Sequence, residues 1–512
     1  MMTQLFGISF RPVWAVILPL LVALFVLLAG KKPNLRESVT LSGSLALCLV
    51  VLSMTPPVLK NGPILFAVPG LLPGVDFAFK ADALGLVFAT TSSCLWVLVS
   101  IYAIGYMHKE HARTRFYFSF ALALAGAVGV AFAANLVTFF IFYELLTIST
   151  YPLVAHDESP KAISAGHKYL AYLLGGGVFF LAAILMTYNL TGTTDFGDLG
   201  ILAPVFEPES GTYLRVLFFF FLIGFAKAAW MPLHSWLPSA MVAPAPVSAL
   251  LHAVAVVKAG VFGITRVVCH IYGVELMQVL GLGIALASIA AVTVIIANVY
   301  AIGQKNLKKM LAYSTISQLS FILLGVGLLS PASVTGAILH IPFHGFMKIT
   351  LFLCAGAAAA IAGVKTIKEA AGLGRKMPVT FTAFTIGAFG MCGLPPLAGF
   401  ISKWHIASGA IESGRLFFLL IICTGSLLDV VYFFPVIRDA FFAKIPESAQ
   451  EPGTAPYTKK TGTVETLKPL TLFMVAPLAV TAAFSVLFCL FPNMFGIYDL
   501  TLMAVTTIFK GM

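Results

Sequence analysis

The sequence predicts an all-α integral membrane protein with about fourteen transmembrane helices. Of its 512 residues, 60% are apolar and only 10% are charged, a composition outside the range of soluble enzymes. Apolar runs of about 20 residues recur along nearly the whole chain, and each is long enough to span ~30 Å of hydrocarbon. Lys and Arg gather in the short loops between these runs, so the net charge of +11 indicates membrane topology rather than nucleic-acid binding.

The candidate spans follow one another without a long gap. They are 13–30, 38–55, 83–104, 116–134, 135–155, 167–189, 214–232, 247–271, 277–302, 310–330, 332–363, 378–411, 416–437 and 469–495. The spans 332–363 and 378–411 exceed the necessary length, so we expect each to be broken, kinked or tilted. The N-terminal apolar run lacks a convincing signal cleavage site and is interpreted as the first span.

The basic residues predict the orientation of the chain. Of the 31 Lys and Arg, 20 fall in odd-numbered loops and 7 in even-numbered loops or near the termini. Because basic loops are retained in the cytoplasm, we expect odd-numbered loops inside the cell and both termini outside, in the cell (inner) membrane. The remaining four basic residues lie within spans: Lys227, Lys258, Lys348 and Lys403.

Two spans combine a lysine with helix-breaking prolines. The pairs are Pro232 and Pro238 near Lys227, in GFAKAAWMPLHSWLPSAM, and Pro395 and Pro396 near Lys403, in GLPPLAGFISKW. Proline removes a backbone donor, so a helix break is expected at each pair. Within a bilayer, a broken helix is tolerated where it packs in protein or lines a wet cavity. A lysine at the bilayer centre costs ~2.5–3.5 kcal/mol. Together these features indicate an ion path inside the membrane.

The two interrupted spans lie five spans apart, which predicts two five-helix units of inverted topology. We place the first unit, the proton uptake half, at 116–271, and the second, the release half, at 310–437. The helices of 1–115 precede them, a linking helix occupies 272–309, and a cytoplasmic loop with the last span occupies 438–512.

Two acidic residues also lie inside spans. Glu144, in the fifth span, has no charged neighbour in the sequence, and an unpaired buried carboxylate either takes up a proton or finds a cation. We expect Lys227 to balance it, because a carboxylate that approaches or leaves a lysine changes the lysine's proton affinity, as a gated relay requires. A structural ion pair is the alternative. Asp429 is a further candidate to pair with a lysine.

Histidines complete the predicted relay. His340, His344 and Lys348 follow at i, i+4 and i+8, so they lie on one helix face with about 6 Å of rise between neighbours. We interpret this stripe as part of a hydrated path, with helix packing as the alternative. His234 and His252 flank the break between Lys227 and Lys258, where imidazole can pass protons near neutral pH or serve a structural role.

The sequence shows no signature of a cofactor. It has no phosphate-binding or dinucleotide-binding glycine motif in the required context and no CxxCH, and its seven cysteines are scattered singly. We therefore predict no cofactor, no metal site and no redox centre in this chain. Whether the chain belongs to an enzyme stays open, and energy has to come from an ion gradient or from partner subunits.

At these residues the chain resembles the antiporter-type membrane subunits of respiratory complex I, Mrp-type cation/proton antiporters and energy-converting membrane hydrogenases. The resemblance covers roughly 115–440 and rests on five segments: FFIFYELLTISTY, KAAWMPLHSWLPSAMVAPAPVSALLHAVAVVKAG, NLKKMLAYSTISQLSFILLG, HIPFHGFMKITLF and GLPPLAGFISKW. It implies fourteen helices with inverted five-helix repeats and a proton path along the membrane midplane. It also implies roles for particular residues: Glu144 and Lys227 as the key pair, Lys258 as the connecting lysine, His344 and Lys348 as the central relay, and Lys403 as the exit residue.

Within this family, the length and Lys403 are most similar to the D-type subunit of Mrp antiporters or its counterpart in membrane hydrogenases. A complex I subunit of type M or N is the alternative. The resemblance implies partner subunits in a multi-subunit membrane complex, with H⁺ and in some members Na⁺ as the transported ions. Two other classes stay open: a stand-alone secondary cation transporter and a purely structural membrane scaffold.

Overall fold

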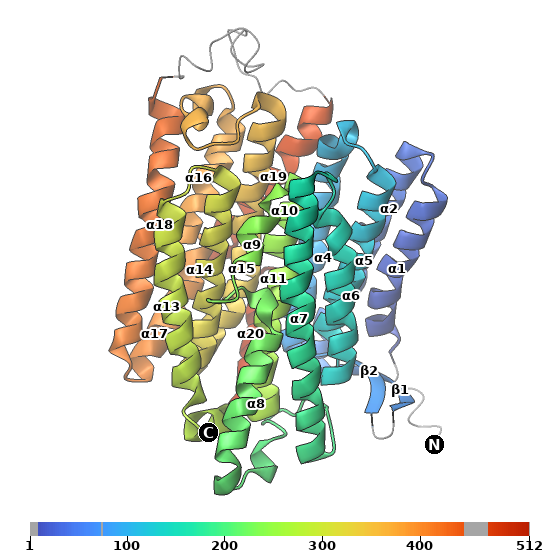
Figure 1. The fold of residues 1–512 in the computed structure, drawn as a ribbon, viewed down its shortest axis with the longest axis vertical. Coiled ribbons are helices and arrows are strands. Elements are labelled where there is room, and N and C mark those ends of the chain that lie inside the picture. Colours follow the sequence, from blue (N-terminus) through green and yellow to red (C-terminus); the bar gives the residue numbers. More distant parts are fainter. Residues whose placement is uncertain (1–8, 73–74, 445–468, 511–512) are drawn as a thin grey trace.

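The computed structural model describes residues 9–72, 75–444 and 469–510 (Figure 1). In these ranges the chain is a bundle of roughly parallel helices with one small sheet at its lower end. Twelve of the described helices are long and apolar enough to cross a membrane. The predicted polytopic, mainly helical fold is confirmed, whereas the count of about fourteen spans stays a prediction.

The N-terminal part contains a hairpin that the sequence pattern did not predict. Its elements are α1 (Arg11–Leu28), α2 (Pro33–Leu52), α3 (Thr55–Asn61), β1 (Ile64–Leu72), β2 (Val75–Ala81) and α4 (Ala83–Tyr106). The antiparallel strands pair Phe66 with Phe79. Strands this short carry little periodic signal beside 20-residue apolar runs. We call this end of the bundle the hairpin end and the opposite one, where most basic loops lie, the basic end.

The first interrupted helix ends earlier than its prolines predicted. The elements here are α5 (Arg113–Phe132), α6 (Leu136–Val154), α7 (Pro160–Thr191), α8 (Gly211–Gly224), α9 (Trp236–Ser239), α10 (Ala245–Ala249), α11 (Val256–Arg266) and α12 (Val274–Val279). The helix stops at Gly224, a 3₁₀ turn spans Ala226–Ala228, and Ala229 is left-handed with φ 54°. Pro232 follows this turn, and Pro238 lies inside the short α9. The break therefore precedes both prolines and contains Lys227.

A second irregularity lies in the span predicted at 247–271. Between α10 and α11 the chain forms a π-helical turn, Leu250–Val254, and a second π-helical turn, Val267–Tyr272, follows α11. His252 belongs to the first of these turns. Such turns cluster at functional sites, and no proline or glycine pattern here predicted one.

The C-terminal part contains the second interruption where it was predicted. The elements are α13 (Leu282–Ile302), α14 (Leu307–Gly327), α15 (Pro331–Ala362), α16 (Pro378–Cys392), α17 (Ala398–Glu412), α18 (Leu416–Phe442), α19 (Pro469–Leu490) and α20 (Ile497–Ile508). Pro395 and Pro396 lie between α16 and α17. In contrast, α15 is one continuous helix of 32 residues. The helix α20, after the last predicted span, was not predicted.

The bounds of the helices can be compared with the limits of the two predicted five-helix units. The range 116–271 holds α5, α6, α7, the interrupted α8 and α10–α11. The range 310–437 holds α14, α15, the α16–α17 pair and α18, which makes four helical segments. The adjoining α13 lies in the predicted linker 272–309, and the limits of the two units stay a prediction. The inverted relation of the two units stays a prediction.

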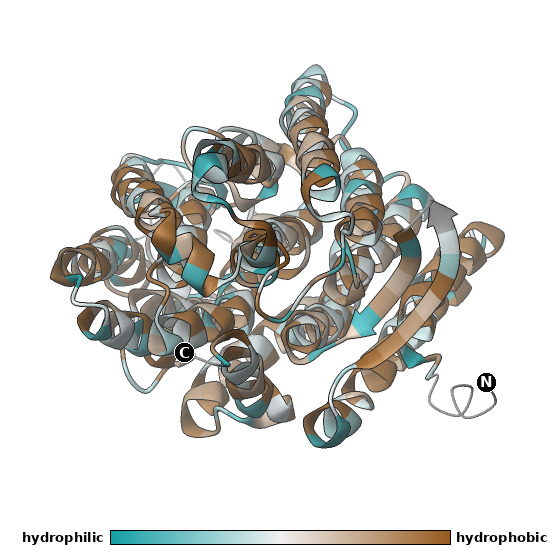
Figure 2. Ribbon diagram, turned by 90° about the horizontal axis from the view of Figure 1, so that it is seen from below, coloured by the Kyte–Doolittle hydropathy of each residue, from teal (hydrophilic) through white to brown (hydrophobic). Residues whose placement is uncertain are grey.

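Burial separates a central core from a lipid-facing rim. The segment Ala245–Tyr272 is completely buried, and α14 and α15 are nearly so. Outer helices expose large apolar side chains, such as Leu28 and Phe417. Figure 2 looks along the bundle and shows the hydrophobic colour on most helices, with the hairpin at the rim. The four predicted lysines thus lie inside the bundle, whereas Glu144 is partly exposed.

Candidate functional site

Lys227 is held by the tyrosine next to Glu144, not by the glutamate itself. Its Nζ donates a hydrogen bond to the carbonyl oxygen of Tyr143 at 2.5 Å and lies 3.1 Å from the centroid of the Tyr143 ring. The Tyr143 hydroxyl in turn donates to the carbonyl of Gly224 at 3.2 Å. Among the described residues Glu144 and Lys227 make no direct ion pair, although their charges still act on one another, so their predicted pairing stays a prediction. The Lys227 ammonium is bound instead by the carbonyl of Tyr143 on α6 and by a cation–π contact with the Tyr143 ring.

Glu144 has no hydrogen-bond partner in the described chain. It is half-buried, and neither of its carboxylate oxygens has a hydrogen-bond partner in the described chain. Its side chain lies against Gly177 of α7, where a Cβ atom would overlap Oε1. A buried acceptor without a donor is rare and costly, so this carboxyl is set up to gain a proton or a cation.

Lys258 contacts the central stripe directly. It is fully buried on α11, and its Nζ lies 2.6 Å from Nδ1 of His344 on α15. Two residues further on, Gly260 packs against the backbone of Lys227 and Ala228, where a side chain would not fit. Only glycine fits this close approach of the two backbones, and the approach brings the helix of Lys258 against the broken segment that holds Lys227.

The predicted stripe on α15 lies inside the bundle. The rings of His340 and His344 are 5.7 Å apart, and both residues are fully buried. His340 Nδ1 lies 2.8 Å from the Ser402 hydroxyl, and its Nε2 lies 3.1 Å from Oε1 of Gln318. The stripe thus connects toward α17 on one side and α14 on the other.

Lys403 and Asp429 form a buried ion pair between α17 and α18. Lys403 Nζ donates to Asp429 Oδ2 at 2.9 Å, and its other contacts are the Met391 carbonyl at 2.7 Å and the Ser426 hydroxyl at 3.1 Å. Gln318 Nε2 donates to the same carboxylate oxygen at 2.7 Å. The three hydrogens of the ammonium meet three acceptors, so this lysine is held as a satisfied cation.

Lys348 is joined to this pair through hydroxyl groups that the sequence pattern did not single out as a connection. Its Nζ donates to Ser314 Oγ at 2.8 Å, and Ser314 lies 2.9 Å from the Tyr432 hydroxyl. Tyr432 is also 2.6 Å from Asp429 Oδ1. A lone serine or tyrosine in an apolar helix is usually a packing residue, so only the fold could reveal this arrangement.

Two predicted histidines have partners outside the set of predicted relay residues. His252 is buried against the Phe352 ring, at 4.5 Å between centroids, and its Nδ1 lies 3.0 Å from the Thr315 hydroxyl. His234 is half-buried beside the rings of Tyr300 and Tyr313. In the described chain neither histidine is hydrogen-bonded to one of the predicted lysines. Hydrogen bonds and ring contacts connect Lys258, the α15 stripe, Lys403 and Asp429, but they do not reach Glu144 or Lys227.

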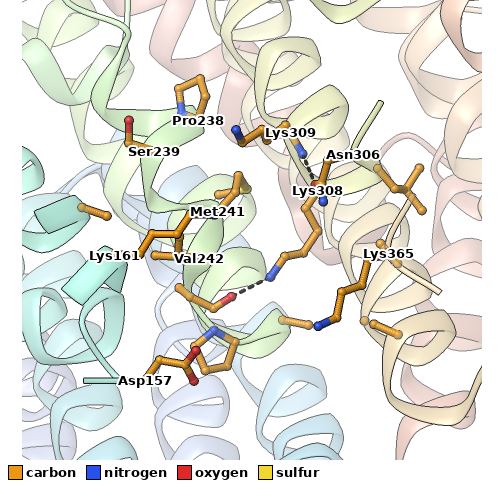
Figure 3. A pocket seen from close by; sticks show the side chains of 18 of the residues that line it. Asp157, Lys161, Pro238, Ser239, Met241, Val242, Asn306, Lys308, Lys309 and Lys365 are labelled. Atoms are coloured by element: carbon orange, nitrogen blue, oxygen red, sulfur yellow. Dashed lines mark hydrogen bonds between the residues drawn. The ribbon is translucent and has the colours of Figure 1, made fainter. Parts of the chain in front are cut away.

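A cavity of about 620 Å³ lies at the basic end (Figure 3). Its lining includes more lysines than acids: Lys161, Lys168, Lys308, Lys309 and Lys365 against Glu110 and Asp157. None of the predicted relay residues lines it. Lys308 extends across the cavity to the carbonyl of Ala243, at 2.6 Å, and so ties the start of α14 to the chain between α9 and α10.

The fold and the candidate site are those of a polytopic membrane protein that buries a row of titratable side chains in the middle of its helix bundle. The sequence profile described as "NADH:quinone oxidoreductase/Mrp antiporter, TM" matches residues 133–429, and that of "NADH-Ubiquinone oxidoreductase (complex I), chain 5 N-terminus" matches 73–117. The first match covers more than half of the chain. The chain therefore belongs to the family of antiporter-like membrane subunits found in complex I and Mrp antiporters.

Individual relatives come from both branches. The chain is 31% identical over 448 residues to NADH-quinone oxidoreductase subunit N of Desulforudis audaxviator, covering 85% of this chain and 87% of that one. It is 34% identical over 355 residues to the A-type subunit of the Na⁺/H⁺ antiporter of Alkalihalophilus pseudofirmus, covering 66% of this chain and 43% of that one. It spans about half of the chloroplast subunit 5 proteins that it matches, such as that of Capsella bursa-pastoris.

Two solved structures share the fold over nearly the whole chain. A chain of the archaeal membrane-bound sulfane sulfur reductase superposes with a TM-score of 0.85 at 26% identity, covering 98% of both chains. A chain of the Mrp complex from Dietzia superposes with a TM-score of 0.84 at 21% identity, covering 98% of this chain and 97% of that one. Both belong to membrane complexes of several subunits.

Proposed function

We propose that this chain is a proton-translocating subunit of a multi-subunit membrane complex. One observation carries the proposal: buried groups on five separate helices meet in a nearly continuous row through the centre of the bundle. The row runs from Lys258 through His344 and His340 to Gln318, Asp429 and Lys403. Charges and imidazoles this deep in a membrane bundle are costly, and they typically mark ion or proton pathways.

In the proposed path, protons enter through the half that holds Glu144 and Lys227. They cross by way of Lys258 and the stripe of His340, His344 and Lys348, and they leave through Lys403. The driving step is an exchange of Lys227 between Tyr143, which holds it in this structure, and the unpartnered carboxylate of Glu144. When Lys227 lies next to Glu144, the carboxylate stabilises the ammonium form of the lysine. When Lys227 returns to Tyr143, this stabilisation is lost and the lysine releases its proton more easily.

Mutation of the uptake half tests this function. We expect Lys227→Ala and Glu144→Gln each to reduce proton flux on the order of tenfold or more, because each removes a group that must gain or hold a proton. The measurement is pH change inside proteoliposomes that contain the whole complex, purified through a tag on this chain, under an imposed potential. Lys109→Ala, which changes an exposed lysine of the basic end, is the matched control. Normal flux in both variants of the relay would refute the proposal.

For the type of subunit, we propose the D type of Mrp antiporters or its counterpart in membrane hydrogenases, on the basis of Lys403. The second candidate, a complex I subunit of type N, is favoured by the match that covers 87% of the Desulforudis subunit N. The two differ in what the purified complex does. Na⁺ flux coupled to H⁺ flux supports the first type, and reduction of a quinone by NADH supports the second. Transport by the isolated chain would instead favour a stand-alone transporter.

A further inference from the structure

An unbroken line of hydrogen bonds joins Lys348 to the Lys403–Asp429 ion pair. The steps are Lys348 Nζ to Ser314 Oγ at 2.8 Å, Ser314 Oγ to the Tyr432 hydroxyl at 2.9 Å, and the Tyr432 hydroxyl to Asp429 Oδ1 at 2.6 Å. All of these side chains are buried, with exposed fractions of 4% for Tyr432 and 0% for Ser314, Lys348 and Asp429. No gap in the line requires a water molecule.

The chemistry of the groups limits the direction of the hydrogens. A hydroxyl carries one hydrogen, and the short contact with a carboxylate favours Asp429 as the acceptor of that of Tyr432. In the structure the Tyr432 hydroxyl is placed to donate to Ser314 Oγ or to Asp429 Oδ1, and its one hydrogen serves one of them at a time. When that hydrogen points to Asp429, the Tyr432 oxygen is free to accept the hydrogen of Ser314, while the ammonium of Lys348 donates to the Ser314 oxygen. In that second arrangement each donor points toward Asp429, and the line runs from the lysine to the carboxylate.

We propose that Ser314 and Tyr432 form a hydroxyl relay that passes a proton from Lys348 to Asp429 and thereby frees Lys403 from its ion pair. The inference rests on the proposed function. In the step, N–H of Lys348 breaks as O–H forms on Ser314, Ser314 gives its former hydrogen to Tyr432, and Tyr432 gives its own to Asp429 Oδ1. The products are a neutral amine on Lys348 and a protonated Asp429, and both hydroxyls are restored.

Burial makes this transfer useful. It turns the buried cation of Lys348 and the buried anion of Asp429, which do not touch one another, into two neutral groups, and it leaves the ammonium of Lys403 as the one charge among the three. Asp429 is the one carboxylate that pairs with Lys403 in the described chain. Once Asp429 is neutral, the ammonium of Lys403 is buried without a counter-ion, which favours release of its proton on the exit side.

A second connection reaches the same carboxylate but conducts less well. His340 contacts Oε1 of Gln318, and Nε2 of Gln318 donates to Asp429 Oδ2. A side-chain amide is a poor proton carrier because its nitrogen does not give up a proton at ordinary pH. The hydroxyl line is therefore the route for the proton, while Gln318 and the carbonyl of Met391 hold Asp429 and Lys403 in place.

Proton flux in proteoliposomes with the whole complex tests the relay. Ser314→Ala interrupts the line without contacting Asp429, and Tyr432→Phe removes one oxygen atom. We expect each to reduce flux on the order of tenfold or more, and Ser314→Thr, which keeps a hydroxyl, to restore at least half of the wild-type flux. Tyr313→Phe, which removes a hydroxyl from the half-buried neighbour of Ser314, is the matched control and should stay within about twofold of wild type.

Infrared difference spectra separate proton transfer from a merely structural role. A pH gradient imposed on these proteoliposomes should produce a carboxylic-acid band that is absent in Asp429→Asn and lost in Ser314→Ala. Wild-type flux in both Ser314→Ala and Tyr432→Phe overturns the relay, and so does an Asp429 band that persists in Ser314→Ala. If Lys227→Ala still abolishes flux in that case, the proposed function stands without the relay. If Lys227→Ala also leaves the flux normal, both the relay and the proposed function are refuted.

Discussion

At the scale of single residues, two close contacts define the surroundings of Lys227 and Glu144. Tyr143 binds the ammonium of Lys227 with its carbonyl and its ring, while the next residue, Glu144, lies against the bare backbone of Gly177. Because Gly177 has no side chain, α7 approaches α6 closely enough to confine the carboxylate. The glycine therefore acts as a positioning residue for Glu144.

This contact gives a prediction for Gly177→Ala. The added methyl group would overlap Oε1 of Glu144, so we expect the carboxylate to shift and proton flux to fall severalfold, with the complex still assembled. Gly175→Ala is the control, since the space around Gly175, on the same helix, is open. Flux and the yield of purified complex are measured for both variants. Equal flux in the two would show that the position of Glu144 does not depend on Gly177.

At the scale of elements, one ion pair joins helices from two parts of the chain at the hairpin end. Arg266, the last residue of α11, donates from both terminal nitrogens to the Asp82 carboxylate at 2.6 Å, and Asp82 Oδ1 also accepts from the Gly85 N–H at the start of α4. Arg266 is only 2% exposed, so its charge is buried together with that of Asp82. Burial by itself would raise the pKa of Asp82. The charge and hydrogen bonds of Arg266 outweigh this effect and lower the pKa from 3.8 to about 2.

This ion pair predicts a pH dependence of stability. Since the pKa of Asp82 falls from 3.8 to about 2 on folding, the pair contributes about 2 kcal/mol at neutral pH. The contribution is fully present above pH ~4 and is lost as the pH falls toward ~2. Asp82→Asn should therefore lower the melting temperature of the purified protein at pH 7, by an amount that shrinks in acid. The control is Asp195→Asn in an exposed loop of the same end. A difference that does not vary with pH would contradict the assignment.

At the scale of the whole molecule, backbone pairing between loops closes each end of the bundle. Backbone pairing joins Phe79 to Ala133 and Asn135 to Asp195 at the hairpin end, and Asn306 to Thr366 at the basic end. Loops that are distant in sequence are thus bound together at each end, with apolar helices between them. This arrangement agrees with a chain that lies across a membrane with its basic loops on one side.

The orientation can be measured with single cysteines. Lys305→Cys lies in an exposed loop of the basic end, and Asp195→Cys in one of the hairpin end. If basic loops are cytoplasmic, a membrane-impermeant maleimide should label Asp195→Cys in intact cells and Lys305→Cys only in inside-out vesicles. The unmodified protein, with its seven native cysteines, provides the background. The reverse pattern would place both termini inside the cell.

The amino-acid sequence by itself determined the class of fold, the second helix break and the lysines that lie within the bundle. These follow from local properties: the length of apolar runs, the missing donor of proline and the cost of charge in hydrocarbon. It did not reveal the hairpin, α20 or the π-helical turn at His252, because short elements depend on contacts with distant segments more than on local periodicity.

Only the tertiary structure decided which of the buried groups are partners. Glu144 and Lys227 were expected to pair, yet the end of α8 at Gly224 places Lys227 on Tyr143. Ser314 and Tyr432 lie 118 residues apart and have no signal in the sequence, and they meet because α14 and α18 pack together around Asp429. Hydrogen-bond partners are set by distances between helices, and those distances depend on how all the side chains of the core pack at once.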